Sequence, residues 1–238
     1  PINEQRARLS LGSLGGGNHF IELNEGEDGS IYLVIHSGSR NLGKQIAEHY
    51  QQVAADTLGN SVSRDLAYVE GDNMKDYLYD LSIAQKYAAF NRKTMVDVIC
   101  RGMNWSVQSE FDTIHNYIDL DNMILRKGAI SAQADEIVII PMNMRDGSLI
   151  CRGKGNPEWN YSGPHGAGRL MSRSQARKQV ALEDFQASME GIWSTSVVSA
   201  TVDESPFAYK AMEDILAHIH DTVDVLEVIK PIYNYKAH

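Results

Sequence analysis

One short stretch of the chain combines a candidate nucleophile with groups that could hold an anion. It runs from Asn160 to Ser174 and places His165 among glycines, which let a bulky ligand approach the backbone. Three arginines follow it, Arg169, Arg173 and Arg177. The residues from Ser172 to Ala187 are predicted to form a helix, whose first N–H groups would face a phosphate near the imidazole. The pattern predicts an anion site beside a nucleophile, although a glycine-rich turn with one surface histidine would have the same spacing.

Three further histidines stand at strand ends or in turns rather than on a helix face. His19 precedes a strand predicted to begin at Phe20, His36 ends the apolar run 31–35, and His115 lies in a polar segment. Imidazole is a suitable ligand for Mn, Zn and Fe. Three of these side chains could therefore hold a divalent metal, with the fourth available for covalent chemistry. A core histidine bonded to the backbone is the alternative for His19.

The elements that must position these residues alternate between helical and strand patterns. Helices are predicted at 42–57, 74–100, 172–187 and 212–220. Strands are predicted at 20–23, 31–35, 123–130, 136–140, 149–152, 194–202 and 223–235. Asp97 and Cys100 could form a metal pair, but the helical pattern already explains both. Without repeats or linkers, residues 1–238 are predicted to form one mixed α/β (α+β) domain, with the site at strand ends and helices outside.

Composition restricts the classes of protein that remain. The chain has 238 residues, 43% of them hydrophobic, enough for a sizeable core. A net charge of -9 argues against coating of nucleic acid over the whole surface, so any basic site must be local. Two cysteines are too few for a disulfide framework, and no apolar run is long enough to span a membrane. These features predict a cytoplasmic protein with no membrane partner, and the start at Pro1 indicates a piece of a longer chain.

Six motifs, taken in order, resemble the RtcB family of RNA-splicing ligases. They are GGGNHFIEL at Gly15 to Leu23, HSGSR at His36 to Arg40, HNY at His115 to Tyr117, RKGA at Arg126 to Ala129, HGAGR-MSR at His165 to Arg173 and AYK at Ala208 to Lys210. The resemblance covers essentially the whole chain.

The resemblance implies a ligase that depends on GTP and Mn²⁺. Such an enzyme joins an RNA 3'-phosphate, or a 2',3'-cyclic phosphate after hydrolysis, to a 5'-hydroxyl end. The histidine of the family's HGAG loop corresponds to His165, which would attack the α-phosphate of GTP and carry GMP as a covalent adduct. A covalent intermediate divides one difficult step into easier ones, and metal ions neutralise the phosphates.

The resemblance also assigns further residues by position. The metal histidines would be His19, His36 and His115, and Arg40 and Arg169 would contact phosphate or RNA. The residues that would bind GMP are Asn18, His19, Phe20, Ile21, Glu22, His115, Asn116, Pro141, Met142, Asn143, Met144, Ser148, His165, Gly166, Ala167, Gly168 and Lys236.

Two Mn²⁺ ions are expected in the complete enzyme, with ligands from an Asp-x-x-Cys-Gly-Met segment that the family carries ahead of these motifs. That segment is not found before Pro1, so weakened or single-metal binding is expected of this chain. The missing segment and an archease-like activator are the implied protein partners. Two alternatives remain: a non-catalytic nucleotide- or RNA-binding fragment, and a metal-dependent phosphohydrolase. GTP binding without an adduct would favour the first, and phosphate release without an adduct would favour the second.

Overall fold

The computed structural model describes residues 2–237, which form two compact units. The helical unit contains the residues up to Gly15 together with Ser37–Ser106. The sheet unit contains Gly16–His36 and the chain from Val107 onward. Helices and mostly antiparallel strands are both present, which confirms the predicted mixed α/β class, whereas the single-domain assignment stays a prediction.

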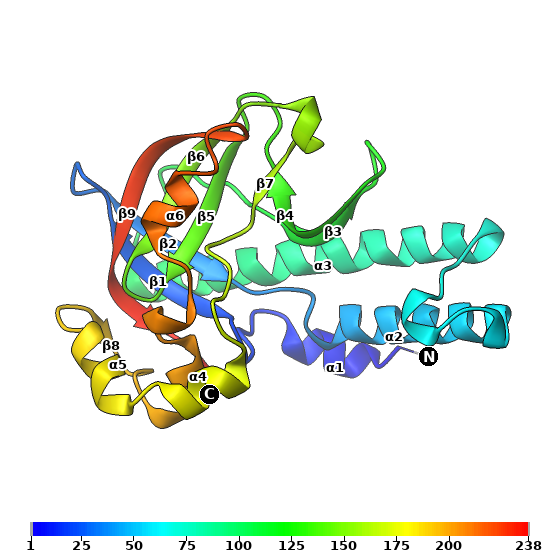
Figure 1. Ribbon diagram of the computed structural model, residues 1–238, viewed down its shortest axis with the longest axis horizontal. Coiled ribbons are helices and arrows are strands. Elements are labelled where there is room, and N and C mark those ends of the chain that lie inside the picture. The colour runs from blue at the N-terminus through cyan, green and yellow to red at the C-terminus, as the bar shows by residue number, and fades with distance from the viewer. Residues whose placement is uncertain (1, 238) are drawn as a thin grey trace. The chain divides into compact units, whose positions relative to one another are not determined.

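The helical unit is built on two long helices that lie side by side and antiparallel (Figure 1). Its elements are α1 (Glu4–Ser10), α2 (Arg40–Leu58), the 3-10 turns η1 (Gly59–Ser61) and η2 (Arg64–Leu66), and α3 (Gly71–Met103). Leu42, Ile46 and Tyr50 recur every four residues on α2 and pack against Ala84 of α3. Both helices were predicted. Each is longer than the sequence pattern indicated, and α3 is followed by Asn104, whose left-handed conformation is a common helix C-cap.

Asn91 on α3 is the polar centre of the helical unit. Its side chain is fully buried, and Oδ1 accepts hydrogen bonds from the backbone N–H groups of Gly12 and Ser13. Nδ2 donates to the backbone oxygens of Ser13 and Gly38 and to the Ser37 hydroxyl. One amide thus provides hydrogen-bond partners for buried groups of two loops that are far apart in the sequence. Without these bonds, the buried groups would carry a desolvation cost.

We expect Asn91→Ala to lower the free energy of unfolding by about 3 kcal/mol, because several buried groups lose their partner at once. Asp97→Ala on the same helix is the control. It removes an exposed i,i+4 pair with Lys93 and should cost no more than about 0.5 kcal/mol. Urea unfolding of the three proteins checks this, and equal losses would contradict the role assigned to Asn91.

The sheet unit contains a larger sheet organised around one long strand. Its strands are β1 (Phe20–Glu25), β2 (Ile31–His36), β5 (Ile137–Asn143), β6 (Gly147–Gly153), β8 (Trp193–Ser194) and β9 (Val223–Tyr235). Their order is β2-β1-β9-β6-β5, and β8 pairs in parallel with β9. The first half of β9 pairs with β6 and the second half with β1 (Figure 1). Pro231, which lacks an N–H, lies where the β1–β9 register shifts, a position that proline tolerates in a sheet.

A smaller sheet carries the segments around His115 and His165. It has the order β3-β4-β7, with β3 (His115–Asp119), β4 (Ile124–Ser131) and β7 (Ser162–Pro164). The main core cluster takes side chains from both sheets, among them Ile130 of β4, Ile140 of β5 and Leu149 of β6. Apolar burial therefore holds the two sheets of this unit together.

The short helices of the sheet unit correct three sequence predictions. They are η3 (Pro157–Trp159), α4 (Arg173–Gln179), α5 (Leu182–Ser188), η4 (Ser199–Glu204), η5 (Pro206–Ala208) and α6 (Met212–Leu216). The helix predicted at 172–187 is two helices, because Val180 and Ala181 are extended, and Ser172 caps the first of them. The strand predicted at 194–202 is wrong beyond Ser194: the Thr201 hydroxyl donates to the backbone carbonyls of Ser196 and Val198, and Ser199–Glu204 is a 3-10 helix. The helix predicted at 212–220 ends at Leu216.

Within residues 2–237, no helix combines the length and the apolar character that crossing a bilayer requires.

Candidate functional site

A pocket opens in the sheet unit where ends of the two sheets meet a glycine-rich loop. It encloses a cavity of about 180 Å³ and opens to solvent at its mouth. Its lining residues are Asn18, Phe20, Glu22, His36, Pro141, Met142, Asn143, Met144, Gly147, His165, Gly166, Ala167, Gly168, Arg169, Arg173, Glu204, Tyr209 and Lys236. These residues come from six separate parts of the sequence, so the pocket is a product of the fold.

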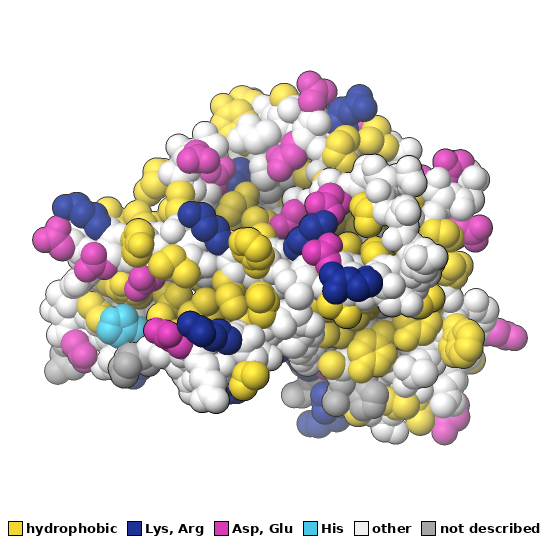
Figure 2. Space-filling model, turned by 180° about the vertical axis from the view of Figure 1, so that it is seen from behind, with side chains coloured by type: hydrophobic (Ala, Val, Ile, Leu, Met, Phe, Trp, Pro, Cys, Tyr) yellow, Lys and Arg dark blue, Asp and Glu magenta, His cyan; other side chains and the backbone are white. Residues whose placement is uncertain are grey.

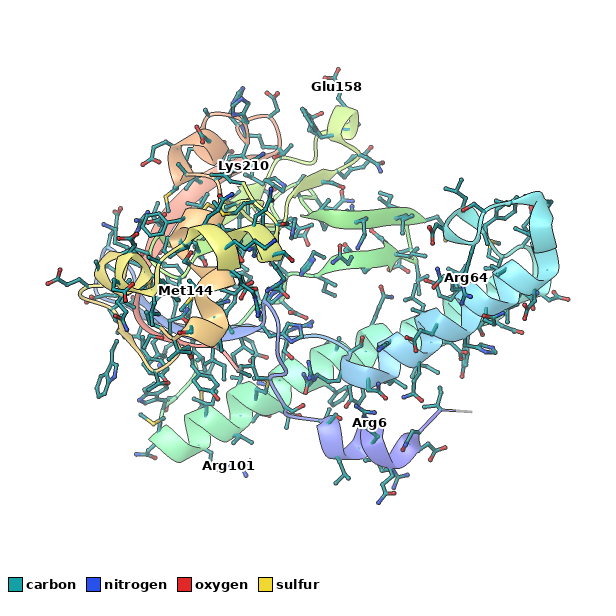
Figure 3. The ribbon with its side chains drawn as sticks, turned by 60° about the horizontal axis from the view of Figure 1, so that its bottom comes forward. Arg6, Arg64, Arg101, Met144, Glu158 and Lys210 are labelled. Carbon is teal, nitrogen blue, oxygen red and sulfur yellow. The ribbon has the colours of Figure 1, made fainter. Side chains whose placement is uncertain are left out.

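The β5–β6 turn forms one wall of the pocket. Gly147, at φ +82°, begins β6, and a Cβ at this position would lie 2.0 Å from the carbonyl oxygen of Ile229 in β9. Glycine therefore lets the turn lie directly against the neighbouring strand. Met144 fixes the other side of the turn (Figure 3). It packs with Phe185 in α5 and with Met189, which directly follows this helix.

Four histidines form a continuous row beside this pocket. The ring centroids are 5.5 Å apart for His19 and His36, 5.1 Å for His36 and His115, and 5.0 Å for His115 and His165. Phe20 also stacks on His36, at 5.4 Å between ring centroids, and places an apolar ring beside the row. The structure thus brings together all four histidines that the sequence singled out, although they are up to 146 residues apart in numbering (165 minus 19).

The row supplies the donor type that a divalent transition metal requires. Imidazole nitrogens bind such metals at about 2.0–2.1 Å, and neighbouring rings at 5.0–5.5 Å are close enough for pairs to share an ion. In the observed side-chain positions, however, no three His, Cys, Asp or Glu side chains within residues 2–237 are grouped to hold one ion. The residue types fit a metal, and a complete ligand set would need a further donor or a small rotation of the rings.

His165 is oriented by a backbone carbonyl. Its Nδ1 lies 2.6 Å from the carbonyl oxygen of Gly128 in β4. A carbonyl oxygen can only accept, so Nδ1 carries the hydrogen in the neutral ring and Nε2 carries the lone pair. The imidazole is therefore in the form that can attack an electrophile through Nε2.

Glu22 is a buried acid in the wall of the pocket. The side chains of Asn24 and Asn234 donate hydrogen bonds to its carboxyl group. Burial raises the pKa of Glu22 from 4.5 to about 7, and the nearby charge of Lys236 together with the two amides limits the rise. Near neutral pH this carboxyl group can accept or release a proton at little cost.

Two buried carboxylates hold the cationic side of the pocket. Glu204 is 3% exposed; its Oε1 lies 2.6 Å from Arg173 and 3.2 Å from Arg169, and its Oε2 lies 3.1 Å from Lys236. Asp203, 1% exposed, pairs with Arg173 and Arg177. These six side chains carry four positive and two negative charges. The cluster therefore keeps an excess of positive charge while each cation has a fixed partner.

Arg169 donates four hydrogen bonds within the protein. Its Nε donates to the carbonyl of Met171, and its terminal nitrogens donate to Glu204, to the Tyr209 hydroxyl and to the carbonyl of Asp203. The Tyr209 hydroxyl in turn donates to Glu204 at 2.8 Å. Most of the five guanidinium N–H groups are thus engaged within the protein, so Arg169 ties the glycine loop to η4.

The chain is similar to known proteins over nearly its whole length. The family model described as "tRNA-splicing ligase RtcB" matches residues 2–237. The chain belongs to the RtcB family. It is 35% identical over 93% of its length to the RNA-splicing ligase RtcB of Escherichia coli K12, and 28% identical over 92% to that of Mycobacterium tuberculosis H37Rv. It is also 27% identical over 91% to the tRNA-splicing ligase RtcB of Aeropyrum pernix. The chain spans 60%, 62% and 57% of the length of these three relatives.

The pocket of this RtcB chain contains most of the residues assigned from the motifs. Asn18, Phe20, Glu22, Pro141 to Met144, the loop 165–168 and Lys236 all line it. Ile21 does not, because side chains alternate along β1 and it points to the other face. Ser148 is fully buried behind Pro141, its partner in the β5–β6 ladder. His19, His115 and Asn116 lie outside the lining, the first two within the histidine row.

Arg40 belongs to the helical unit rather than to the unit that contains the pocket. Its Nε donates to the Ser13 hydroxyl, and its guanidinium lies against Gly15. The phosphate and RNA contacts assigned to Arg40 and Arg169 stay predictions. Pocket residues that the motif-based assignment omitted are Gly147, Arg173, Glu204 and Tyr209. The run of arginines from Arg169 to Arg177 has no acidic residue within it, which indicates that carboxylates from elsewhere in the chain pair with it. The sequence alone does not identify these carboxylates.

The surface in Figure 2 has no single basic area: Lys and Arg side chains are interspersed with acidic and apolar ones. This agrees with the net charge of -9. An anionic ligand would therefore be attracted by local groups such as the Glu204 cluster rather than by the molecule as a whole.

Stability should depend on the protonation of Glu22. Because its folded pKa, about 7, lies above its ordinary value of 4.5, its favourable contribution is complete below about pH 4.5 and is lost as the pH rises through 7. Glu22→Gln should remove this dependence. The unfolding free energy of the variant minus that of the unchanged protein should therefore rise by up to about 3 kcal/mol as the pH increases from 4.5 to 8.5. Urea unfolding across this range checks it, and parallel curves for both proteins would be contrary to expectation.

Glu204→Gln should lower the free energy of unfolding by about 3 kcal/mol, because it leaves three buried or half-buried cations with one carboxylate fewer. Asp224→Asn is the matched control. It removes an exposed pair with Lys154 and should cost less than about 1 kcal/mol. A loss in Glu204→Gln no larger than that of the control would mean that the cluster is not a stabilising one.

Proposed function

We propose that this chain carries the nucleotide-transfer centre of an RtcB-type RNA ligase that uses GTP and Mn²⁺. The observation that supports this most directly is His165: its Nδ1 is engaged by Gly128, and its Nε2 is the available nucleophilic atom beside the pocket. The names of the relatives, RNA-splicing and tRNA-splicing ligases, supply the reaction class.

In the proposed first step, Nε2 of His165 attacks the α-phosphorus of GTP. A P–N bond forms, the bond to the β-phosphate oxygen breaks, and pyrophosphate leaves. The ring becomes positively charged, and Gly128 stabilises this charge by accepting the Nδ1 hydrogen bond. Bound manganese would neutralise phosphate charge and align the groups, with His19, His36 and His115 as the residues that would hold it.

The nucleotide base would lie deeper in the pocket, against Phe20 and Glu22. Guanine presents two adjacent donors, N1–H and the N2 amino group, which match the two oxygens of a carboxylate. Glu22 is positioned for such a pair because Asn24 and Asn234 hold its carboxyl group. Adenine lacks this pair of donors, so the same carboxyl group would favour GTP over ATP. Lys236, between Glu22 and Glu204, adds a cation at this end.

In the later steps the RNA ends would react at the same centre. A 3'-phosphate oxygen attacks the phosphorus of the adduct, and the P–N bond breaks to free His165. The 5'-hydroxyl then attacks the activated 3'-phosphorus, loses its proton and displaces GMP. The excess positive charge of the Glu204 cluster would attract these phosphates.

Intact-protein mass after incubation with GTP and Mn²⁺ tests the proposal. We expect the unchanged protein to gain the mass of one GMP and His165→Ala to gain none. His218→Ala is the control: this exposed histidine also has Nδ1 on a backbone carbonyl, that of Asp214, but does not line the pocket. It should form as much adduct as the unchanged protein.

Two other outcomes would contradict the proposal and identify its rivals. GTP binding without any adduct would support a non-catalytic nucleotide-binding fragment. Release of phosphate without an adduct would support a metal-dependent phosphohydrolase.

A further inference from the structure

The ladder between β3 and β4 is interrupted beside His165. His115 pairs with Ile130, whereas Tyr117 pairs with Arg126, so the single residue Asn116 faces the three residues between Arg126 and Ile130. Such bulges redirect backbone groups and are often found next to active sites. Gly128, with φ +66°, lies in the middle of this bulge and is the residue whose carbonyl contacts His165.

Asn116 closes the bulge with its side chain. Its Oδ1 accepts a hydrogen bond from the Gly128 N–H at 2.6 Å, and its own φ of +58° turns the backbone out of the strand. Asparagine and glycine are the residues that adopt this conformation most readily. The contacts form a series in which Asn116 accepts from the Gly128 N–H, and the Gly128 carbonyl accepts from Nδ1 of His165.

We propose that Asn116 and Gly128 are positioning residues that set the tautomer of His165. This inference rests on the proposed function, in which Nε2 is the attacking atom. Without the bond to Gly128, an imidazole can also place its hydrogen on Nε2, and the attacking lone pair is then lost. His115 stacks on one face of the ring at 5.0 Å and restrains its position, but a stacked ring does not choose between the two tautomers.

The proposal gives Asn116 a role different from direct contact with a nucleotide. A residue that only binds GTP would change the affinity for GTP when it is removed. A residue that sets the tautomer would leave the affinity unchanged and slow adduct formation at saturating GTP.

The test uses Asn116→Gly, which removes Oδ1 but tolerates the positive φ, and Asn116→Asp, which keeps an acceptor oxygen and tolerates that φ. Asn122→Ala, in the turn between the same two strands, is the control because Asn122 makes its hydrogen bonds to Asp119 and not to Asn116, Gly128 or His165. The readout is the ¹⁵N chemical shift of the His165 ring nitrogens in metal- and nucleotide-free protein. His165→Gln identifies the signals.

We expect Nδ1–H alone in the unchanged protein, in Asn116→Asp and in Asn122→Ala, and a substantial Nε2–H fraction in Asn116→Gly. Adduct formation by Asn116→Gly at saturating GTP should fall by between about tenfold and about 10⁴-fold, the range from partial to complete loss of the correct tautomer. Retention of Nδ1–H alone in Asn116→Gly would overturn the inference. Since the tautomer is read without GTP, a shifted tautomer in a protein that forms no adduct would support the positioning role and reject only the proposed function.

Discussion

Backbone pairing along β9 is the constraint on which the pocket depends. One half of this strand bonds to β6, which brings the Pro141 to Met144 wall into place, and the other half bonds to β1, which carries Phe20 and Glu22. The strand ends at Tyr235, and the next residue, Lys236, lines the same pocket. Segments more than a hundred residues apart are therefore fixed side by side by hydrogen bonds that involve no side chain.

The pocket separates two kinds of electrostatic environment. At Glu22, burial favours the neutral carboxyl group, and amides surround it. Around Glu204, four cations share two buried carboxylates, and positive charge remains in excess. A nucleotide has matching parts, since its base carries hydrogen-bond donors and its phosphates carry negative charge. A strongly acidic chain can thus offer a local site for an anion without a basic surface.

The sequence predicted the members of this site better than their connections. The four histidines and the loop 165–168 were found because polar and glycine-rich segments at strand ends are visible in a local pattern. The pairing of Arg169 and Arg173 with Glu204 was not predictable, because it joins residues about thirty positions apart through a segment that itself resembled a strand. The bond from His165 to Gly128 depends on a bulge, and a bulge follows from the register between strands rather than from either strand alone.

The same reasoning explains the errors in the fold. Val180 and Ala181 interrupt a segment whose apolar spacing is helical throughout. The segment 196–204 has the residue types of a strand, but the Thr201 hydroxyl bonds to its backbone carbonyls. Tertiary packing around Phe185 and Val202 decides both. Long, regular elements such as α2, α3 and β9 were predicted because their periodicity extends over many residues.

A crystal structure of this chain with GMP and Mn²⁺ would test the central claim most directly. The account predicts guanine between Phe20 and Glu22, with the phosphate on the Nε2 side of His165 and the Nδ1–Gly128 bond intact. A pocket that stays empty at saturating GMP, or a phosphate bound on the Nδ1 side, would contradict it.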